Sequence, residues 1–512
     1  MATAVEGAPQ PLTGSKLVLT GFMLALANFM VVLDLTIANV SVPHIAGGLA
    51  VSPSQGTWVI TSYAVAEAIC VPLSGWLAQR FGPARVFTVA MLMFAFWSAM
   101  CGLADSLGML VVCRILQGFS GGPMIPLSQT LLLRVFPKEK QSAAIGLWAM
   151  TTVVAPIAGP VLGGTICDLY GWEWIFYINV PIAVPCALAV WAAIGSTDDQ
   201  PVKRRVDVIG LGLLIVWVGA MQIMLDKGKE LDWFASPVIV TLAIIAAIGF
   251  LVFLIWELTE AEPIVNLRVF RHRGFAIGSW TVSLGFGAYF ASIVLIPLWL
   301  QTNEGYTATW AGYAMAFNGM LAVVFSPIVA RLTTKFDSRR LVAFGLCMVT
   351  TISLWRMAGF NTGVTFWDVA MPNLIQGIAV PFFFVPLTGL ILSSVDPEET
   401  ASAAGLSNFM RTTAGAFATS LVTTGWEDAT EDARTQLAGL VQDGASLVDR
   451  LSASGMTALQ ATRQLDLLVN AQAVQIATNR MFGYSAAVLL LGAIAISLAP
   501  KPKRVVQPGG GH

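Results

Sequence analysis

Long apolar stretches recur along the whole chain and constrain its fold more than any other feature. Each has about 20 residues or more, which is enough for a helix to cross the hydrocarbon core of a bilayer. They are, approximately, residues 16–41, 55–78, 86–104, 107–132, 142–166, 175–195, 206–225, 236–256, 274–300, 309–332, 341–359, 366–394, 402–425 and 480–499. Only 11% of the residues are charged and 56% are hydrophobic, which leaves too little polar surface to cover a soluble globule. We therefore predict an all-α polytopic membrane protein with fourteen transmembrane helices.

Lysine and arginine are distributed unevenly between the two sides of the predicted membrane. If the N-terminus is cytoplasmic, 19 of the 28 fall in tails and loops on the cytoplasmic side. Seven, including Arg356, are assigned to the outer side, and Arg114 and Arg411 lie inside spans. Because basic residues accumulate on the cytoplasmic side of membrane proteins, both termini are predicted to be cytoplasmic. The polar segment 1–15 lacks the pattern of a cleaved signal peptide, so the first span is expected to be retained.

Two parts of the sequence are similar to each other. The segment PLSQTLLLRVFPKEKQSAAIGL from Pro126 aligns with PLTGLILSSVDPEETASAAGL from Pro386, and the two share two prolines and a Ser-Ala-Ala run. Further upstream, PLSGWLAQRFGPARV from Pro72 aligns with PIVARLTTKFDSRRLV from Pro327. Duplicated halves around a site near the membrane midplane are typical of secondary transporters. The sequence therefore predicts two six-helix bundles with two spans inserted between them.

The repeat divides the chain into segments. They are a tail 1–15, a first six-helix bundle 16–200, two inserted spans 201–265, a second six-helix bundle 266–500 and a tail 501–512. The second bundle includes a hydrophilic outer loop, 426–479, with seven acidic and three basic residues. Apolar residues between 437 and 451 recur at helical spacing, which predicts an amphipathic helix there. The loop is either a solvated connector or a docking surface for another protein.

Four charged residues lie well within predicted spans, away from their ends: Asp34, Glu67, Arg114 and Arg411. Each costs roughly 2.5–3.5 kcal/mol to place in lipid, so each is expected to face the interior of the bundle. We predict that Asp34 carries the coupling proton and that Arg114 is its partner; a static ion pair between two spans is the alternative. Glu67 is a second candidate proton carrier, an attractor of cationic substrate or a structural carboxylate. Arg411 is either a substrate ligand or an anchor that bonds backbone carbonyls.

A central cavity is expected to be lined by polar side chains with aromatic and methionine side chains between them. The predicted substrate-binding residues are Asn28, Met30, Asn39, Gln117, Gln129, Phe290, Asn318, Gln376, Phe383 and Arg411. A wide and mostly apolar cavity with few polar groups suits amphiphilic organic molecules better than sugars. Each apolar residue of the set, considered alone, is explained by packing or by contact with lipid as well as by substrate binding.

The run APIAGPVLGG, residues 155–164, lies within an apolar span that contains no charged side chain. Glycines at this density let two helices approach closely in a bilayer, and prolines bend a helix at fixed points. The candidate conformational residues of this run are Pro156, Gly159, Pro160, Gly163 and Gly164. The run resembles the antiporter motif on the fifth span of exporters in the major facilitator superfamily, with an ordinary small-residue packing face as the alternative.

Further motifs extend this resemblance over nearly the whole chain. They occupy residues 33–43 in the first span, 114–118 in the fourth, 172–181 before the sixth and 222–234 between the inserted spans. The loop after the second span keeps the superfamily spacing at Gly75, Arg80, Gly82 and Arg85. Its usual acidic residue is replaced by Gln79. The chain resembles the fourteen-span drug:proton antiporters of the EmrB/QacA type, and most narrowly the EmrB-type component of tripartite multidrug pumps.

The resemblance implies proton-driven efflux of small amphiphilic drugs across the inner membrane, with protons as the coupling ion, no cofactor and no enzymatic activity. Beside the lipid bilayer, it implies a periplasmic adaptor (a membrane fusion protein) and a TolC-type outer-membrane channel as partners, and no nucleic acid. An exporter of a specific metabolite or siderophore and a nutrient symporter of the same fold are the alternatives. A polytopic membrane enzyme is a further rival, although the sequence contains no clustered nucleophile, metal-binding or acid–base group.

Overall fold

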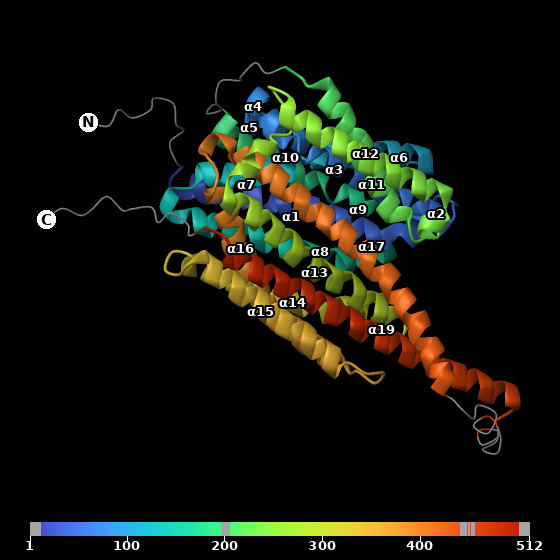
Figure 1. Cartoon of the computed structure of the whole chain (residues 1–512). Helices are drawn as coiled ribbons and strands as arrows, with labels where there is room; N and C mark the ends of the chain where they lie inside the picture. The colour runs from blue at the N-terminus through green and yellow to red at the C-terminus, as the bar shows by residue number, and fades with distance from the viewer. Residues whose placement is uncertain (1–11, 196–204, 441–447, 449–450, 452–455, 501–512) are drawn as a thin grey trace, which may run out of the picture.

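The computed structural model describes residues 12–195, 205–440, 448, 451 and 456–500. These residues form helices joined by short connections, with no strand among them (Figure 1). The first half of the chain forms α1 (Gly14–Gly48), α2 (Pro53–Gly56), α3 (Trp58–Cys70), α4 (Ser74–Phe81), α5 (Pro83–Gly102), α6 (Leu107–Gly121), α7 (Met124–Val135), α8 (Gln141–Tyr170), α9 (Trp174–Tyr177) and α10 (Val180–Ile194). The inserted region forms α11 (Val208–Lys227) and α12 (Pro237–Thr259). The second half forms α13 (Arg273–Thr302), α14 (Ala308–Leu332), α15 (Ser338–Gly359), α16 (Phe366–Ser393), α17 (Thr400–Leu440) and α19 (Ala458–Ser497).

The spans follow the predicted order. Eleven described helices are long and apolar enough to cross a membrane, and thirteen if each of two bent pairs counts as one span. The bent pairs are α3 with α4, at 57°, and the two parts of α8, at 46°. Pro72 lies between α3 and α4, and Pro156 and Pro160 lie inside α8, where the missing N–H groups weaken the helical hydrogen-bond ladder. α17 lies at the position of the remaining predicted span, but this more polar helix is not part of that count.

The same helix pairings recur in the two halves. In the first half α1 packs against α8 and α10, α3 packs against α6, and α5 packs against α6 and α10. In the second half α13 packs against α17 and α19, α14 packs against α16, and α15 packs against α16 and α19. The pairings therefore make α13, α14, α15, α16, α17 and α19 the counterparts of α1, α3, α5, α6, α8 and α10, as the sequence repeat requires.

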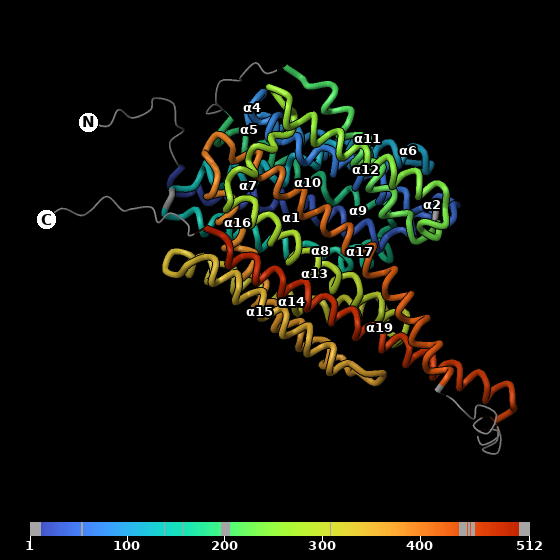
Figure 2. The backbone as a smooth tube through the Cα atoms, viewed as in Figure 1, coloured from blue at the N-terminus to red at the C-terminus, as the bar shows by residue number. Residues whose placement is uncertain are grey.

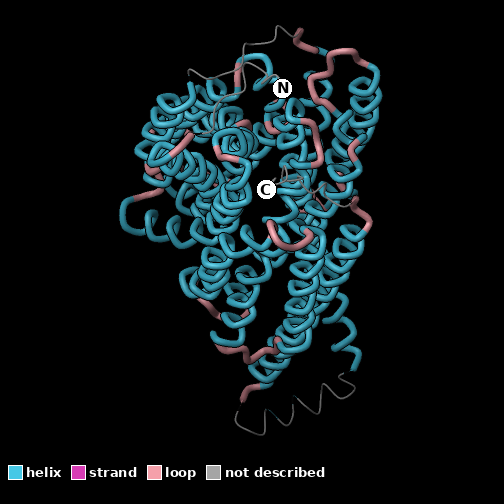
Figure 3. The backbone as a smooth tube through the Cα atoms, turned by 90° about the vertical axis from the view of Figure 1, so that its left-hand side faces the viewer, coloured by secondary structure: helices cyan, strands magenta, loops and turns pink. Residues whose placement is uncertain are grey.

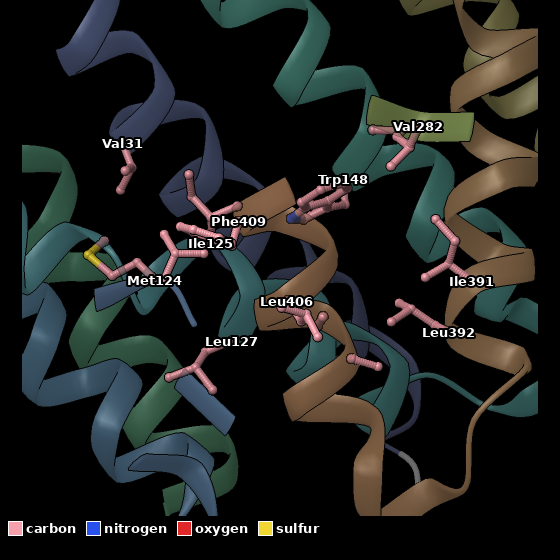
Figure 4. Packing of buried hydrophobic residues seen from close by; sticks show 14 of the residues in the cluster. Val31, Met124, Ile125, Leu127, Trp148, Val282, Ile391, Leu392, Leu406 and Phe409 are labelled. Atoms are coloured by element: carbon pink, nitrogen blue, oxygen red, sulfur yellow. The ribbon is translucent and has the colours of Figure 1, made fainter. Parts of the chain in front are cut away.

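The halves meet along α8, which packs on α14 and α16, and along α17, which packs on α4 and α7. Large side chains fill this interface (Figure 4). Trp148 of α8 stacks on Phe384 of α16 with ring centroids 6.2 Å apart and planes inclined by 6°. Leu406 and Phe409 of α17 belong to the same hydrophobic core as Ile125 of α7. Apolar packing thus joins the halves around the charged residues described below.

The inserted helices lie at the side of the two-half assembly, where α11 bridges α3 and α17. On α17, Ser420 Oγ donates to the backbone oxygen of Leu225 at 2.8 Å. On the α3 side, Lys227 Nζ donates to Thr57 Oγ1 at 2.6 Å. In its most apolar window α12 is only 17% buried, so nearly all of that surface is available to lipid. The pair therefore covers one flank of the joint between the halves.

The two ends of the molecule differ (Figures 1 and 2). One end contains Leu12 and Ala499, near the two ends of the described chain, and we call it the terminal face. There the nitrogen of Leu12 donates to Val135 O, and Arg339 Nη1 donates to Ala499 O. At the opposite end, the far face, α17 and α19 extend beyond the other helices as an antiparallel pair (Figure 3). We call this pair, 426–440 with 458–479, the far-face hairpin. Within the predicted amphipathic stretch 437–451, residues 441–447 and 449–450 lie outside the described residues.

Candidate proton-coupling and substrate site

Asp34 lies on α1 with no exposed surface. Its Oδ2 atom accepts a hydrogen bond from Arg114 Nη1 of α6 at 2.7 Å, and Arg114 is also fully buried. Its Oδ1 atom accepts from Gln117 Nε2 at 3.1 Å and from Asn179 Nδ2 at 2.6 Å. One carboxylate therefore receives three donors from the same half, two from α6 and one from the residue that precedes α10. An enclosed carboxylate needs such donors because the membrane interior offers no water to replace them.

Arg114 is held by more than its ion pair. Its Nε atom donates to the backbone oxygen of Val59 at 3.1 Å, and its Nη1 atom donates to Gln117 Oε1 at 2.8 Å. The guanidinium carbon lies 4.1 Å from the ring centroid of Tyr63 and 5.5 Å from that of Phe176. The rings and the backbone bond stabilise the cation independently of the Asp34 charge. Arg114 can therefore stay in place when Asp34 is protonated.

Asn179 belongs to this network, although sequence reasoning did not select it as a site residue. It immediately precedes α10, at the N-cap position, and its Nδ2 atom also donates to Ser98 Oγ at 3.0 Å. The Ser98 hydroxyl in turn donates to Phe176 O at 2.9 Å. The available signal was its place within the motif 172–181, where it precedes an apolar helix.

Arg411 of α17 lies in a cage of aromatic rings between the halves. Its guanidinium carbon is 5.5 Å from the ring of Trp148, 5.1 Å from Phe286 and 5.6 Å from Phe384. The residue is 3% exposed, and its Nε and Nη1 atoms have no hydrogen-bond partner among the described residues. Glu67 of α3 is 6% exposed and lies within electrostatic range of Arg411. The cage therefore presents unused N–H donors beside apolar ring surface.

Two of the predicted cavity amides join helices to one another. Asn28 donates from Nδ2 to the hydroxyls of Thr151 and Thr152 on α8, at 2.8 and 2.9 Å. Gln129 of α7 accepts from Asn408 Nδ2 of α17 at 3.0 Å, across the joint between the halves. Both amides are buried. Gln117, also a predicted cavity residue, belongs to the Asp34 network.

The other predicted cavity residues are not brought into one group. Met30 and Phe383 are buried in the main hydrophobic core, and Phe290 is half-buried and stacks on Phe286 at 5.6 Å. Asn39 is exposed. The last two, Asn318 and Gln376, are buried in the second half, where Asn318 Nδ2 donates to Tyr289 OH at 3.2 Å.

The glycine-rich run on α8 packs directly on the helix that carries Asp34. A Cβ on Gly159 would collide with the side chain of Thr36, and a Cβ on Gly163 would lie 3.0 Å from Ile37 Cγ1 and from its carbonyl oxygen. Thr36 and Ile37 follow Asp34 by two and three positions on α1. Gly164 has no atom within 4 Å of a Cβ position. Pro156 and Pro160 lie at and just after the 46° bend of this helix.

The loop motif after α3 lies at the terminal face. A Cβ on Gly75 would collide with Ser402 of α17, so the halves touch there through glycine. Gln79 Nε2 donates to Glu398 O of the second half at 3.4 Å. Gly82 adopts φ +89°, which favours glycine. The remaining two motif residues are arginines: Arg80 lies 5.4 Å from the ring of Trp76, and Arg85 is exposed.

One group of described residues has the ligand types of a metal site. His272, Asp396 and Glu399 lie together at the terminal face, with His272 Nε2 2.9 Å from Glu399 Oε2. Arg271 Nη2 contacts the same carboxylates, 3.2 Å from Asp396 and 3.1 Å from Glu399. A guanidinium in this position already neutralises the acidic groups, so the cluster is best described as an ion-pair network.

Comparison with known proteins identifies the family. The Major Facilitator Superfamily profile matches residues 24–419. The multidrug export protein EmrB of Escherichia coli (strain K12) is 45% identical over 506 residues, which cover 98% of this chain and 99% of that protein. The fatty acid resistance protein FarB of Neisseria gonorrhoeae is 42% identical, with the same coverage of 98% and 99%. These matches confirm the predicted family and all-α membrane fold, and they exclude the rival interpretation as a membrane enzyme. The chain is a multi-span membrane transporter that belongs to the EmrB-type group of the major facilitator superfamily.

Proposed function

We propose that this protein exports amphiphilic toxic compounds, driven by proton influx through alternating access of its two halves. The buried Asp34–Arg114 pair carries the proposal, because a carboxylate inside a membrane helix bundle is costly and is typical of a proton or substrate pathway in a transporter. The sequence has no Gly-rich phosphate-binding loop of the GxxxxGK(S/T) type with which to use ATP, and the proton gradient is the natural alternative source of energy. Multidrug export is also the named activity of the E. coli relative.

The proposed cycle begins with a proton that reaches Asp34 from the outer side. Protonation removes the charge attraction to Arg114, whose bond to Val59 O and contact with Tyr63 keep the guanidinium in place. α1 is then free to shift against α8, because Gly159 lets the two helices touch at Thr36 without an intervening side chain. Release of the proton to the cytoplasm restores the pair and resets the site. In this scheme the terminal face is cytoplasmic, and the protein lies in the inner membrane.

Glu67 has a secondary part in this proposal. It is buried on α3 within electrostatic range of both Asp34 and Arg411, so it links the coupling network to the aromatic cage. A change in the charge of Asp34 changes the electrostatic potential at Glu67, because the interior of the protein has a low dielectric constant. Glu67 is therefore the second candidate proton carrier.

The Arg411 cage is the proposed contact for the polar end of a substrate. Its unused N–H groups suit a carboxylate or another acceptor, while the rings of Phe286 and Phe384 suit an apolar tail. This combination favours amphiphiles with an acidic head, and the N. gonorrhoeae relative is named for fatty acid resistance. The same observation favours drug export over export of a polar siderophore or uptake of a sugar.

The far-face hairpin is the proposed docking surface for a periplasmic adaptor that passes substrate to a TolC-type channel. Arg434 Nη2 lies 2.6 Å from Asp466 Oδ1 and Trp426 Nε1 donates to Thr478 Oγ1 at 2.9 Å, so the helices are held together. Three leucines on the α19 arm of this hairpin are exposed: Leu459 at 80%, Leu467 at 55% and Leu468 at 53%. Several exposed leucines on one extension suit a surface that binds a partner.

The experiment is transport in proteoliposomes with an imposed pH gradient. The purified protein is reconstituted, and accumulation of a fatty acid and of a lipophilic cation is followed together with the internal pH. The proposal is supported if the drug moves in the direction opposite to the protons and the proton flux matches the drug flux. Drug movement in the same direction as the protons would identify a symporter, and gradient-independent movement would remove the coupling role of Asp34.

A further inference from the structure

The second half contains a buried polar cluster at the place that corresponds to the Asp34 network of the first half. Arg114 of α6 donates to Val59 O of α3 at 3.1 Å, and Asn373 of α16 donates to Ala314 O of α14 at 3.1 Å. Because α16 and α14 are the counterparts of α6 and α3, the two bonds are equivalent. Asn373 therefore occupies the position of Arg114.

Neighbouring residues extend this correspondence. Gln117 lies three positions after Arg114, and Gln376 lies three positions after Asn373. The glycine that follows each glutamine packs on a backbone carbonyl of the facing helix, that of Tyr63 in one half and that of Asn318 in the other. Both halves thus share the backbone framework of one site, but the second half places a neutral amide where the first has a guanidinium.

Arg356 of α15 supplies the cation in the second half. It is 1% exposed, its Nη2 atom donates to Asn373 Oδ1 at 2.7 Å, and its guanidinium carbon lies 5.8 Å from the ring of Phe482. Its Nε and Nη1 atoms are buried without a hydrogen-bond partner among the described residues. Within the described chain, Tyr289 is the titratable group that acts on it electrostatically, and no carboxylate does so.

A buried guanidinium without a counter-charge is costly, because neither lipid nor apolar side chains replace its hydration. The other buried cations of the described chain lie near carboxylates. Arg114 pairs with Asp34, Lys227 lies 2.7 Å from Glu230, and the charge of Arg411 interacts with a nearby carboxylate on α3. Arg356 differs from them, because no carboxylate among the described residues pairs with it, and we therefore look for its counter-charge outside the described protein.

We propose that the Arg356 cluster binds a small monovalent inorganic anion, which occupies in the second half the electrostatic role that the Asp34 carboxylate has in the first. The unused N–H groups of Arg356 are its donors, and Ser353, one turn earlier on α15 with an unpartnered and buried hydroxyl among the described residues, is a further donor. The anion is a structural counter-ion that fixes α15 against α16. The site does not depend on which compound the protein exports.

The test measures thermal unfolding of the full-length protein in detergent, with chloride or gluconate at equal ionic strength. Chloride is expected to raise the midpoint of the wild type by roughly 2 °C or more, since a ligand of the folded state stabilises by mass action. Arg356→Gln is expected to abolish that rise. Arg463→Gln removes an exposed arginine of the far-face hairpin and is expected to keep the full rise.

A second variant keeps the test decisive if Arg356→Gln does not fold. Asn373→Asp places a carboxylate at the atom that Arg356 already contacts, so it supplies the missing charge from within the chain. The measured quantity is the difference between the unfolding midpoints of one variant in the two salts. Loss of the bond to Ala314 O lowers both midpoints of that variant and therefore does not affect the difference. A chloride effect absent from Asn373→Asp supports the proposal. No chloride effect in the wild type, or an undiminished effect in either Arg356→Gln or Asn373→Asp, would overturn it.

Discussion

Oδ2 of Asp34 lies 2.7 Å from Nη1 of Arg114, and neither side chain has exposed surface. Asn179 and Gln117 donate to the other carboxylate oxygen, so the negative charge is solvated by the protein alone. Both partners also have contacts outside the pair: Asp34 has these two amide donors, and Arg114 has a backbone bond and two aromatic neighbours. The predictions below follow from this pair and from the helix contacts around it.

Asp34→Asn is expected to abolish coupling of drug efflux to proton influx while leaving the protein folded. Asparagine has nearly the same shape and still accepts hydrogen bonds, but it cannot carry a proton. The measurement is drug-evoked proton movement in proteoliposomes, with drug binding to the purified variant as the check on folding. Asp168→Asn, at a carboxylate that is 69% exposed, is the matched control and should retain coupling.

Wild-type coupling in Asp34→Asn would show that Asp34 is structural. Glu67, the other buried carboxylate near this network, would then become the candidate carrier, and Glu67→Gln would be assayed in the same way.

Arg114→Gln is expected to destabilise the protein by about 3 kcal/mol, because it leaves the Asp34 carboxylate buried without its cation. The double variant Asp34→Asn with Arg114→Gln removes both charges and should be more stable than Arg114→Gln alone. Unfolding of the three variants in one detergent gives the comparison. A double variant less stable than both single variants would show that the pair contributes no mutual charge compensation.

How far the sequence predicts these features depends on the kind of signal. The repeat and the family motifs are visible because prolines, glycines and the Ser-Ala-Ala runs mark bends and close helix contacts. The Asp34–Arg114 contact is predictable because two opposite charges in lipid must each find a partner. Asn179 is not predictable in this way, because a neutral amide at the start of a helix is common and costs less free energy than a charge placed in lipid.

Arg356 shows where sequence reasoning fails. It lies three positions before the end of α15, and the charge count therefore assigned it to the outer side. The structure instead buries it, through contacts with Asn373 of α16 and Phe482 of α19. Hydropathy along one helix does not reveal whether its end faces water or a neighbouring helix, since that depends on residues that are distant in the sequence.

Gly159→Ala is expected to impair transport and lower stability by about 1–3 kcal/mol, because the added methyl group would collide with Thr36 and separate α8 from α1. Gly164→Ala is the matched control, since no atom lies within 4 Å of its Cβ position. The control should match or slightly exceed the wild type in stability, because alanine favours helix formation. Equal transport by both variants would show that the glycine contact with α1 is not required.

The last prediction concerns the far-face hairpin. Deleting residues 438–465 and joining the ends with a short Gly-Ser linker is expected to preserve transport in proteoliposomes but to abolish drug resistance in cells. The design is feasible because Arg434 Nη2 lies 2.6 Å from Asp466 Oδ1, so the two helices are already side by side at the cut. The physical reason for the split result is that the hairpin is proposed to bind the adaptor and contributes no residue to the Asp34 network or the Arg411 cage.

The control for this deletion is Glu431→Gln, which changes one exposed charge of the hairpin and should leave resistance intact. The measurement is resistance in a pump-deleted host with and without a co-expressed adaptor, beside proton-driven efflux by the purified variant. Because transport and resistance are scored on the same protein, loss of both would indicate misfolding rather than lost docking. Undiminished resistance with a transport-competent deletion would show that the hairpin is only a connector between α17 and α19.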